Sequence, residues 1–342
     1  MTININNVEN LVFSGGGVKV IAYAGALKAL EETGHLSQIK KVAGTSGGAI
    51  TALCVALGYN PEEIDIILKD IDFNKFADSV EPQYVISEWI KNFVTSIFNF
   101  LKPYTSYADQ AIQFLSTYGI HPGNEVKSFL EDLVTKKGFS KDVTFKELND
   151  STTSKELYVV MTNLNTQYPE IISYKSAPNT KIVDCVHASG AFPFYFKPVE
   201  INGNSYVDGG IMKNYPIDIF DQGAKIVDDK TIGFKPINKE LIDAYQQGRE
   251  PQPFVKVNNA YNFGVAVAEA ITSSDSMEAL KNSYRSVLID DLGISALQFD
   301  LTDTQKIDMI THGHDATTEF IQANQNYESS VLGQDSTESL AA

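Results

Sequence analysis

The chain has 342 residues, of which 43% are apolar and 20% charged, and its formal net charge is −16. Such values are ordinary for a globular protein with a substantial core. The excess of acidic groups disfavours nucleic acid and anionic membrane surfaces as electrostatic partners. No run approaches the ~18–20 uninterrupted apolar residues of a membrane span, and residues 1–7 lack the basic start and apolar core of a signal peptide. We therefore expect a protein that is cytoplasmic as synthesised.

A glycine turn follows the first predicted strand, residues 11–13, and leads into a predicted helix over residues 18–32 that ends at Gly34. The three glycines are Gly15, Gly16 and Gly17. Backbone N–H groups at such a turn suit a phosphate or the oxyanion of an acyl-transfer intermediate. The spacing matches neither G-x-G-x-x-G nor G-x-x-x-x-G-K-[ST], so we expect an oxyanion hole rather than a nucleotide site.

The second motif is a G-x-S-x-G pattern formed by Gly44, Ser46 and Gly48. A short hydrophobic run over residues 39–43, broken by two lysines, precedes it, and a helix-compatible apolar stretch over residues 49–57 follows. This context is typical of a nucleophile elbow, which is a sharp strand-to-helix turn that exposes a nucleophilic serine. Small residues on either side of the serine allow the strand and the helix to approach. Ser46 is therefore a candidate nucleophile.

The third motif is Asp208, which ends a predicted strand over residues 205–208 and precedes Gly209 and Gly210. A carboxylate in this place can act as a general base. Asp-Gly is also a common turn dipeptide, so by itself the pattern does not distinguish the two roles.

The remaining predicted elements alternate between strands and helices, which indicates an α/β fold with a central, largely parallel sheet. A helix is expected after Asn60 and Pro61, and another over residues 124–137, ended by Gly138. Further strands are expected over 157–162, 171–174, 231–234, 286–289 and 296–301, and further helices over 260–273 and 304–325.

Taken together, the three motifs resemble those of the patatin-like phospholipase family over roughly residues 9–235. Residues 188–198 look like that family's A-S-x-A-x-P-x-x-F-x-P segment, and Asn214 to Pro216 like its N-x-P. The family usually has glycine where this chain has Val20, and a β-branched residue here must lie within the helix, because it does not tolerate positive φ. The resemblance implies a three-layer α/β/α fold and a serine–aspartate dyad.

The resemblance also implies an activity of the phospholipase A or lysophospholipase type. In that scheme Ser46 attacks an ester carbonyl of a lipid while Asp208 takes its proton, and the three glycines hold the oxyanion. Lys19 would either add positive charge near the glycine loop or the lipid head group, or point to solvent. We expect a phospholipid or other lipid ester as substrate, transient contact with a membrane surface, and an activating protein partner as an open option. No metal-ligand spacing or cofactor motif is present, so neither group is expected.

Two alternatives remain from the residues alone. The first is an α/β-hydrolase with a Ser-Asp-His triad, because His312 and His314 follow Asp208 in the chain, although Ser46 lies nearer the amino terminus than the elbow of that fold. The second is a catalytically silent binding or effector module that retains the fold. The intact serine, glycines and aspartate argue against this module, and Val20 alone favours it.

An amphipathic stretch between residues 81 and 107 has an aromatic-rich face with a helical spacing that includes Trp89, Phe93 and Ile97. It suits a lipid-contacting lid, but its polar face has few of the basic residues of interfacial helices, which favours a helix packed in the core. A lid that packs against the core when closed satisfies both interpretations.

The motifs and the later elements together predict one domain over residues 8–328, with a flexible tail over 329–342. The tail is polar, small and mildly acidic, which is typical of a disordered end or of a secretion signal. Export into a target cell therefore stays open.

Overall fold

The computed structural model of the chain describes residues 2–71, 118–223, 226–258, 266–267, 269–271, 273 and 275–338. The residues predicted to form a lid, Trp89, Phe93 and Ile97, lie outside these ranges. Side chains are described up to residue 325, except those of residues 120 and 194.

The centre of the molecule is a mixed sheet with the strand order β10-β9-β1-β2-β4-β8-β7, in which β5 also pairs with β4. The first five strands of this order are parallel to one another, whereas β5, β8 and β7 pair antiparallel. This arrangement confirms the predicted α/β fold with a largely parallel sheet. The strands are β1 (Asn10–Phe13), β2 (Lys41–Thr45), β4 (Glu156–Asn163), β5 (Tyr168–Ile172), β7 (Val199–Ile201), β8 (Asn204–Asp208), β9 (Thr231–Ile237) and β10 (Ser286–Asp290), and β3 (Gly119–His121) pairs separately with β6 (Phe194–Phe196).

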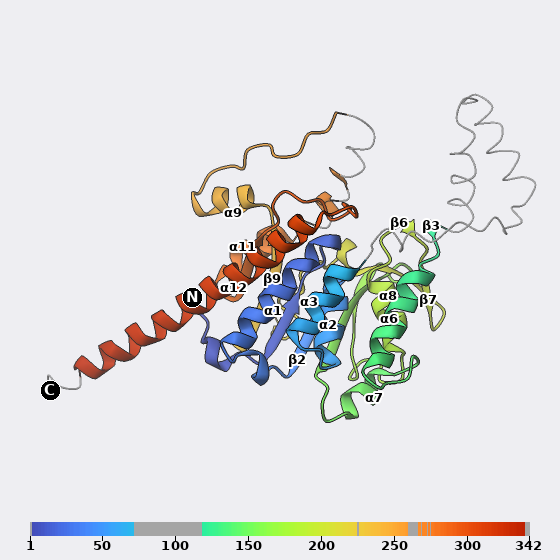
Figure 1. Cartoon of the computed structure of the whole chain (residues 1–342), viewed down its shortest axis with the longest axis horizontal. Coiled ribbons are helices and arrows are strands. Elements are labelled where there is room, and N and C mark those ends of the chain that lie inside the picture. The colour runs from blue at the N-terminus through green and yellow to red at the C-terminus, as the bar shows by residue number, and fades with distance from the viewer. Residues whose placement is uncertain are drawn as a thin grey trace, which may run out of the picture.

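Helices flank the sheet, and α12 runs along α1 and extends beyond the body of the molecule (Figure 1). Their ends follow local capping chemistry: a capping box of Asn60 and Glu63 begins α3, and Gly34 takes a φ of +80° just after α1. The described helices are α1 (Ala22–Glu32), α2 (Gly47–Ala56), α3 (Pro61–Asp70), α6 (Asn124–Lys136), α7 (Phe145–Asp150), α8 (Ile182–Ser189), α9 (Lys239–Gln246), α11 (Ser276–Lys281) and α12 (Asp303–Glu338).

The core lies on both faces of the sheet, because successive side chains of a strand point to opposite sides. Leu11 and Phe13 of β1 belong to the larger cluster, together with residues of α1, α2 and α8. Val12, which lies between them, belongs to a smaller cluster with Tyr215 and Ile217. All four residues of β1 are buried, as expected for a central parallel strand.

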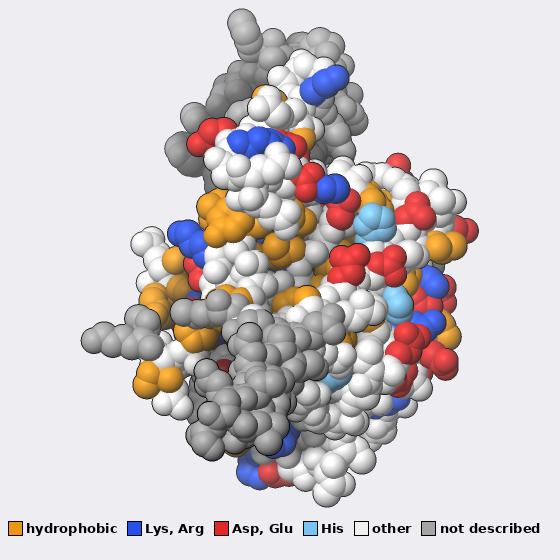
Figure 2. Space-filling model, turned by 90° about the vertical axis from the view of Figure 1, so that its left-hand side faces the viewer, with side chains coloured by type: hydrophobic (Ala, Val, Ile, Leu, Met, Phe, Trp, Pro, Cys, Tyr) orange, Lys and Arg blue, Asp and Glu red, His pale blue; other side chains and the backbone are white. Residues whose placement is uncertain are grey.

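Acidic and basic side chains are interspersed on the face shown in Figure 2, and hydrophobic side chains form several separate groups there. No described helix is long and apolar enough to cross a membrane.

Two predicted elements differ from the structure. Residues 296–301, expected as a strand, are irregular, because Ala296 forms hydrogen bonds with the turn after β1 and with a side chain instead of with a neighbouring strand. The last helix, expected to end near residue 325, continues as α12 to Glu338, into the segment expected to be a tail. The helix expected over 260–273 lies partly outside the described residues, and its described residues 266–267 and 269–271 are helical.

Candidate active site

The candidate nucleophile lies between β2 and α2. Ser46 follows the last residue of β2 and has a φ of 54° and a ψ of −128°, a conformation that costs a non-glycine residue of order 1–3 kcal/mol. It caps the amino terminus of α2, whose partial positive charge favours a developing anion. This is the geometry expected of a strand-to-helix turn that exposes a serine.

Close backbone contacts explain the glycines on either side of Ser46. A Cβ on Gly44 would lie 2.2 Å from the carbonyl oxygen of Gly48, and one on Gly48 would lie 2.5 Å from the carbonyl oxygens of Phe13 and Ser14. No side chain fits at such distances, so strand and helix approach only because both positions are glycine.

The structure brings Ser46 and Asp208 together. The Ser46 hydroxyl donates to Oδ2 of Asp208 over 2.7 Å, and the other carboxylate oxygen, Oδ1, accepts the N–H of Gly210 over 2.7 Å. Asp208 is positioned through its backbone: its N–H donates to the carbonyl of Ala191, and its carbonyl accepts the Thr162 hydroxyl. The two residues are 162 positions apart in the sequence.

The carboxyl group of Asp208 is buried, with 3% of the residue exposed. Burial raises its pKa to about 6, against the opposing effect of the hydrogen bonds from Ser46 and Gly210, which favour the ionised form. A carboxylate with such a pKa is a better general base near neutral pH than an ordinary aspartate.

Ser189, at the end of α8, holds the backbone of Ser46, a role that the sequence did not predict. The N–H of Ser46 donates to its hydroxyl oxygen over 2.8 Å, and that hydroxyl donates to the carbonyl of Val160 in β4 over 2.6 Å. Ser189 therefore connects the elbow to the sheet. Its place in the A-S-x-A segment is the signal that could have indicated it.

The glycine turn lies beside Ser46 and Asp208, and its three glycines differ in their contacts in a way that the sequence did not predict. The N–H of Gly15 donates to the carbonyl of Asn214 over 3.0 Å, and the amide of Asn214 donates back to the carbonyl of Gly15 over 3.2 Å. Gly15 therefore holds the turn rather than offering its N–H to a ligand. Gly16 and Gly17 line the cavity that contains Ser46 and Asp208.

That cavity has a volume of about 100 Å³ and a largely apolar wall. Ile50, Phe192, Tyr195, Leu297 and Phe299 contribute to it. A largely apolar wall that also includes a serine, a carboxylate and two glycine backbones suits the apolar part of an ester.

Lys19 is buried and paired with two carboxylates. The residue is 7% exposed, and its ammonium group lies 2.8 Å from Asp291 and 3.1 Å from Glu269. Burial lowers its pKa, but the two carboxylates outweigh this effect and raise the pKa above its ordinary value. Lys19 therefore neither points to solvent nor offers an unpaired charge to a head group.

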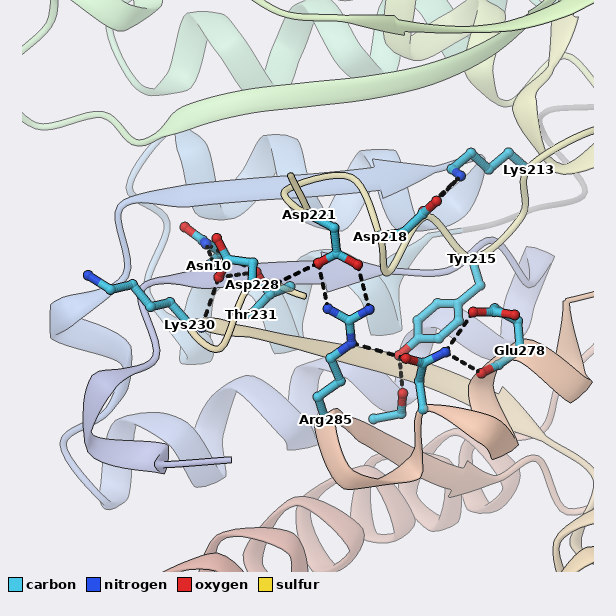
Figure 3. Close-up of polar contacts among 12 residues, drawn as sticks. Asn10, Lys213, Tyr215, Asp218, Asp221, Asp228, Lys230, Thr231, Glu278 and Arg285 are labelled. Atoms are coloured by element: carbon cyan, nitrogen blue, oxygen red, sulfur yellow. Dashed lines mark hydrogen bonds and ion pairs between the residues drawn. The ribbon is translucent and has the colours of Figure 1, made fainter. Parts of the chain in front are cut away.

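The segment after Asp208 is anchored to the far edge of the sheet (Figure 3). Arg285 forms two hydrogen bonds with the carboxylate of Asp221, at 2.7 and 2.8 Å, and the hydroxyl of Tyr215 bonds that of Ser286 at 2.8 Å. Because Asn214 precedes Tyr215, these contacts also fix the residue that holds Gly15.

The histidines of the triad alternative lie elsewhere. Nε2 of His314 is 2.9 Å from Glu32, and Nδ1 of His312 is 3.9 Å from Asp290. Neither lines the cavity that contains Ser46 and Asp208. In the described part of the chain, the side chain that accepts a hydrogen bond from the Ser46 hydroxyl is Asp208.

Known proteins resemble the chain over most of its length. It is 30% identical over 310 residues to the uncharacterized protein R571 of Acanthamoeba polyphaga mimivirus, covering 89% of this chain and 90% of that protein. It is 28% identical over 211 residues to the probable lipid hydrolase 463L of Invertebrate iridescent virus 6, covering 62% of each. Among solved structures, VipD from Legionella pneumophila superposes with a TM-score of 0.55 at 17% identity, covering 93% of this chain and 67% of that one.

The VipD superposition supports the fold alone. The model of the patatin-like phospholipase family matches residues 11–221, a range that includes the glycine turn, the serine elbow and Asp208. The chain therefore belongs to the patatin-like phospholipase family.

Proposed function

We propose that the protein is a lipid acyl hydrolase of the phospholipase A or lysophospholipase type that uses Ser46 and Asp208 as a catalytic dyad. The observation that carries the proposal is the 2.7 Å hydrogen bond from the Ser46 hydroxyl to the buried carboxylate of Asp208, at a strained elbow beside a glycine turn. Family membership and the relative named as a probable lipid hydrolase support it.

In the first half of the reaction, Asp208 removes the proton from the Ser46 hydroxyl as the oxygen attacks the ester carbonyl. The N–H groups of Gly16 and Gly17 stabilise the negative charge that develops on the carbonyl oxygen. Asp208 then gives its proton to the departing alcohol, which leaves an acyl group on Ser46. In the second half, a water molecule loses its proton to Asp208 and releases the fatty acid, and the proton returns to Ser46.

Membrane contact is the second part of the proposal. With a net charge of −16, attraction to anionic lipid cannot bring the enzyme to a bilayer, so apolar side chains or a protein partner must do so. Among the described residues, Phe254, Val255 and Val257 are each about half exposed on an irregular segment. They are exposed apolar side chains close together in the sequence and offer one such contact.

The test is product analysis with phosphatidylcholine vesicles and a soluble short-chain ester, each incubated with the purified protein and with a Ser46→Ala variant. We expect free fatty acid and lysophospholipid from the wild-type protein, and a fluorophosphonate probe attached to Ser46 in peptide maps. Absence of ester cleavage on both substrates, with vesicle and detergent conditions varied, would support a silent binding module instead.

A further inference from the structure

Glu269 lies outside the residues matched by the family model, yet it contacts the catalytic cavity. It lines the chamber that contains Ser46 and Asp208, and it also lines a second cavity of about 460 Å³ beside it. A carboxylate at the boundary between two cavities needs compensating partners, because burying an unpaired charge is costly.

Each carboxylate oxygen of Glu269 has a different partner. Oε2 accepts from the ammonium of Lys19, which is in the 3₁₀ turn Gly17–Ile21 that begins at the last of the three glycines. Oε1 accepts from the hydroxyl of Ser295, at 2.7 Å, and from the N–H of Ala296.

Ala296 in turn touches the glycine turn. Its carbonyl oxygen accepts the N–H of Val18 over 3.1 Å. A Cβ on Gly17 would lie 2.0 Å from the same oxygen, so the two backbones are in direct contact. Glu269 is therefore connected to Gly17 by two short routes, one through Lys19 and one through Ala296.

We propose that Glu269 is a positioning residue that fixes the backbone of Gly16 and Gly17 relative to Ser46, through its contacts with Lys19 and Ala296. The inference rests on the proposed function. Displacement of a catalytic group by about 1 Å can lower the rate about 10²-fold, so loss of these contacts reduces turnover even though Glu269 never meets the reacting atoms.

Substitution at Glu269 tests this role. In Glu269→Gln the amide oxygen still accepts from Ala296, and Lys19 keeps its ion pair with Asp291, so no charge is left unpaired and the variant is expected to fold. We expect about a tenfold fall in kcat on a soluble short-chain ester, about a hundredfold fall in Glu269→Ala, and KM within about threefold of the wild-type value in both. Glu278→Gln, at an exposed glutamate of α11, is the matched control and should retain the wild-type kcat.

Three readouts separate positioning from other roles. Turnover is expressed per molecule that reacts with a fluorophosphonate at saturation, so unfolded protein does not count. The pH midpoint of kcat should stay at the wild-type value, because Glu269 acts on geometry and not on the pKa of Asp208. Melting temperatures measure the effect of each substitution on stability. If the alanine variant does not fold, kcat of the glutamine variant alone tests the positioning role.

Wild-type kcat in the glutamine and alanine variants would overturn the inference, as would a raised KM with unchanged kcat, which would place Glu269 in contact with substrate. A shifted pH midpoint that accounts for the whole loss would also overturn it. These outcomes differ from failure of the proposed function, in which the wild-type protein shows no ester cleavage that depends on Ser46.

Discussion

Gly25 of α1 and Gly313 of α12 lie where the two helices meet in backbone contact. A Cβ on Gly25 would lie 1.8 Å from the carbonyl oxygen of Ile310, and one on Gly313 would lie 1.9 Å from the carbonyl oxygen of Ala22. Each helix thus presents a glycine to the backbone of the other, and no larger residue fits at either position without separating them.

Gly313→Ala should therefore destabilise the protein, although alanine is the better helix former by about 1 kcal/mol. Forcing the helices apart costs typically about 1–3 kcal/mol or more, which outweighs the gain in propensity. Denaturant unfolding followed by circular dichroism measures the difference. Glu319→Ala, at an exposed position on the same helix, should change stability little. A Gly313→Ala variant as stable as the wild type would show that the helices do not meet this closely.

Ser46→Ala and Asp208→Asn should each remove nearly all ester hydrolysis while the fold is kept, because both changes are nearly isosteric. The double variant should lose little more than either single variant, because residues that act as one catalytic unit are not additive. Initial rates on a soluble ester give the comparison. His312→Ala and His314→Ala serve as controls and should stay within a few fold of wild type. A large loss in either histidine variant would favour a triad.

The pH dependence of turnover should follow the ionisation of Asp208. Burial raises the pKa of this carboxyl to about 6, and the base must be ionised to accept the proton from Ser46. We therefore expect kcat/KM on a soluble ester to rise with pH through about 6 and then to level off. A midpoint near 4, as for an exposed aspartate, would contradict the buried state of the group.

The same ionisation should be measurable as a stability effect. The folded-state pKa of Asp208 lies above its ordinary value of 3.8, so the folded protein holds a proton that the unfolded chain releases between about pH 4 and 6. The contribution of Asp208 to the free energy of unfolding therefore falls as pH rises through that window, by up to about 3 kcal/mol. An asparagine in its place carries no ionisable group. The Asp208→Asn variant should therefore be more stable than the wild-type protein at pH 8 and nearly equal to it in stability at pH 4. Unfolding curves at both pH values test this, and an equal difference at both would contradict it.

The sequence predicts those parts of the fold and site that depend on local chemistry. Gly44 beside Ser46, the capping residues Asn60 and Glu63, and the terminal Gly34 each have their effect within a few residues, and the structure has the expected element at each.

Contacts between distant residues could not be predicted in this way. Lys19 meets Glu269 and Asp291 after separations of 250 and 272 residues, and no pattern near Lys19 indicates that its charge is already paired. Gly15 was expected to serve the oxyanion, but its N–H faces Asn214, 199 positions away. The strand expected over 296–301 has suitable apolar residues, yet tertiary contacts decide its conformation.

The position of β1 in the middle of the sheet has a consequence for how the chain is made. One edge of β1 pairs with β2, which leaves the ribosome soon afterwards, but the other pairs with β9, which begins only at Thr231. The hydrogen bond from Val18, just after the glycine turn, to Ala296 can form only when that residue has also been synthesised. A nascent chain therefore carries Ser46 and Asp208 well before the contact between Ala296 and the turn beside them can form.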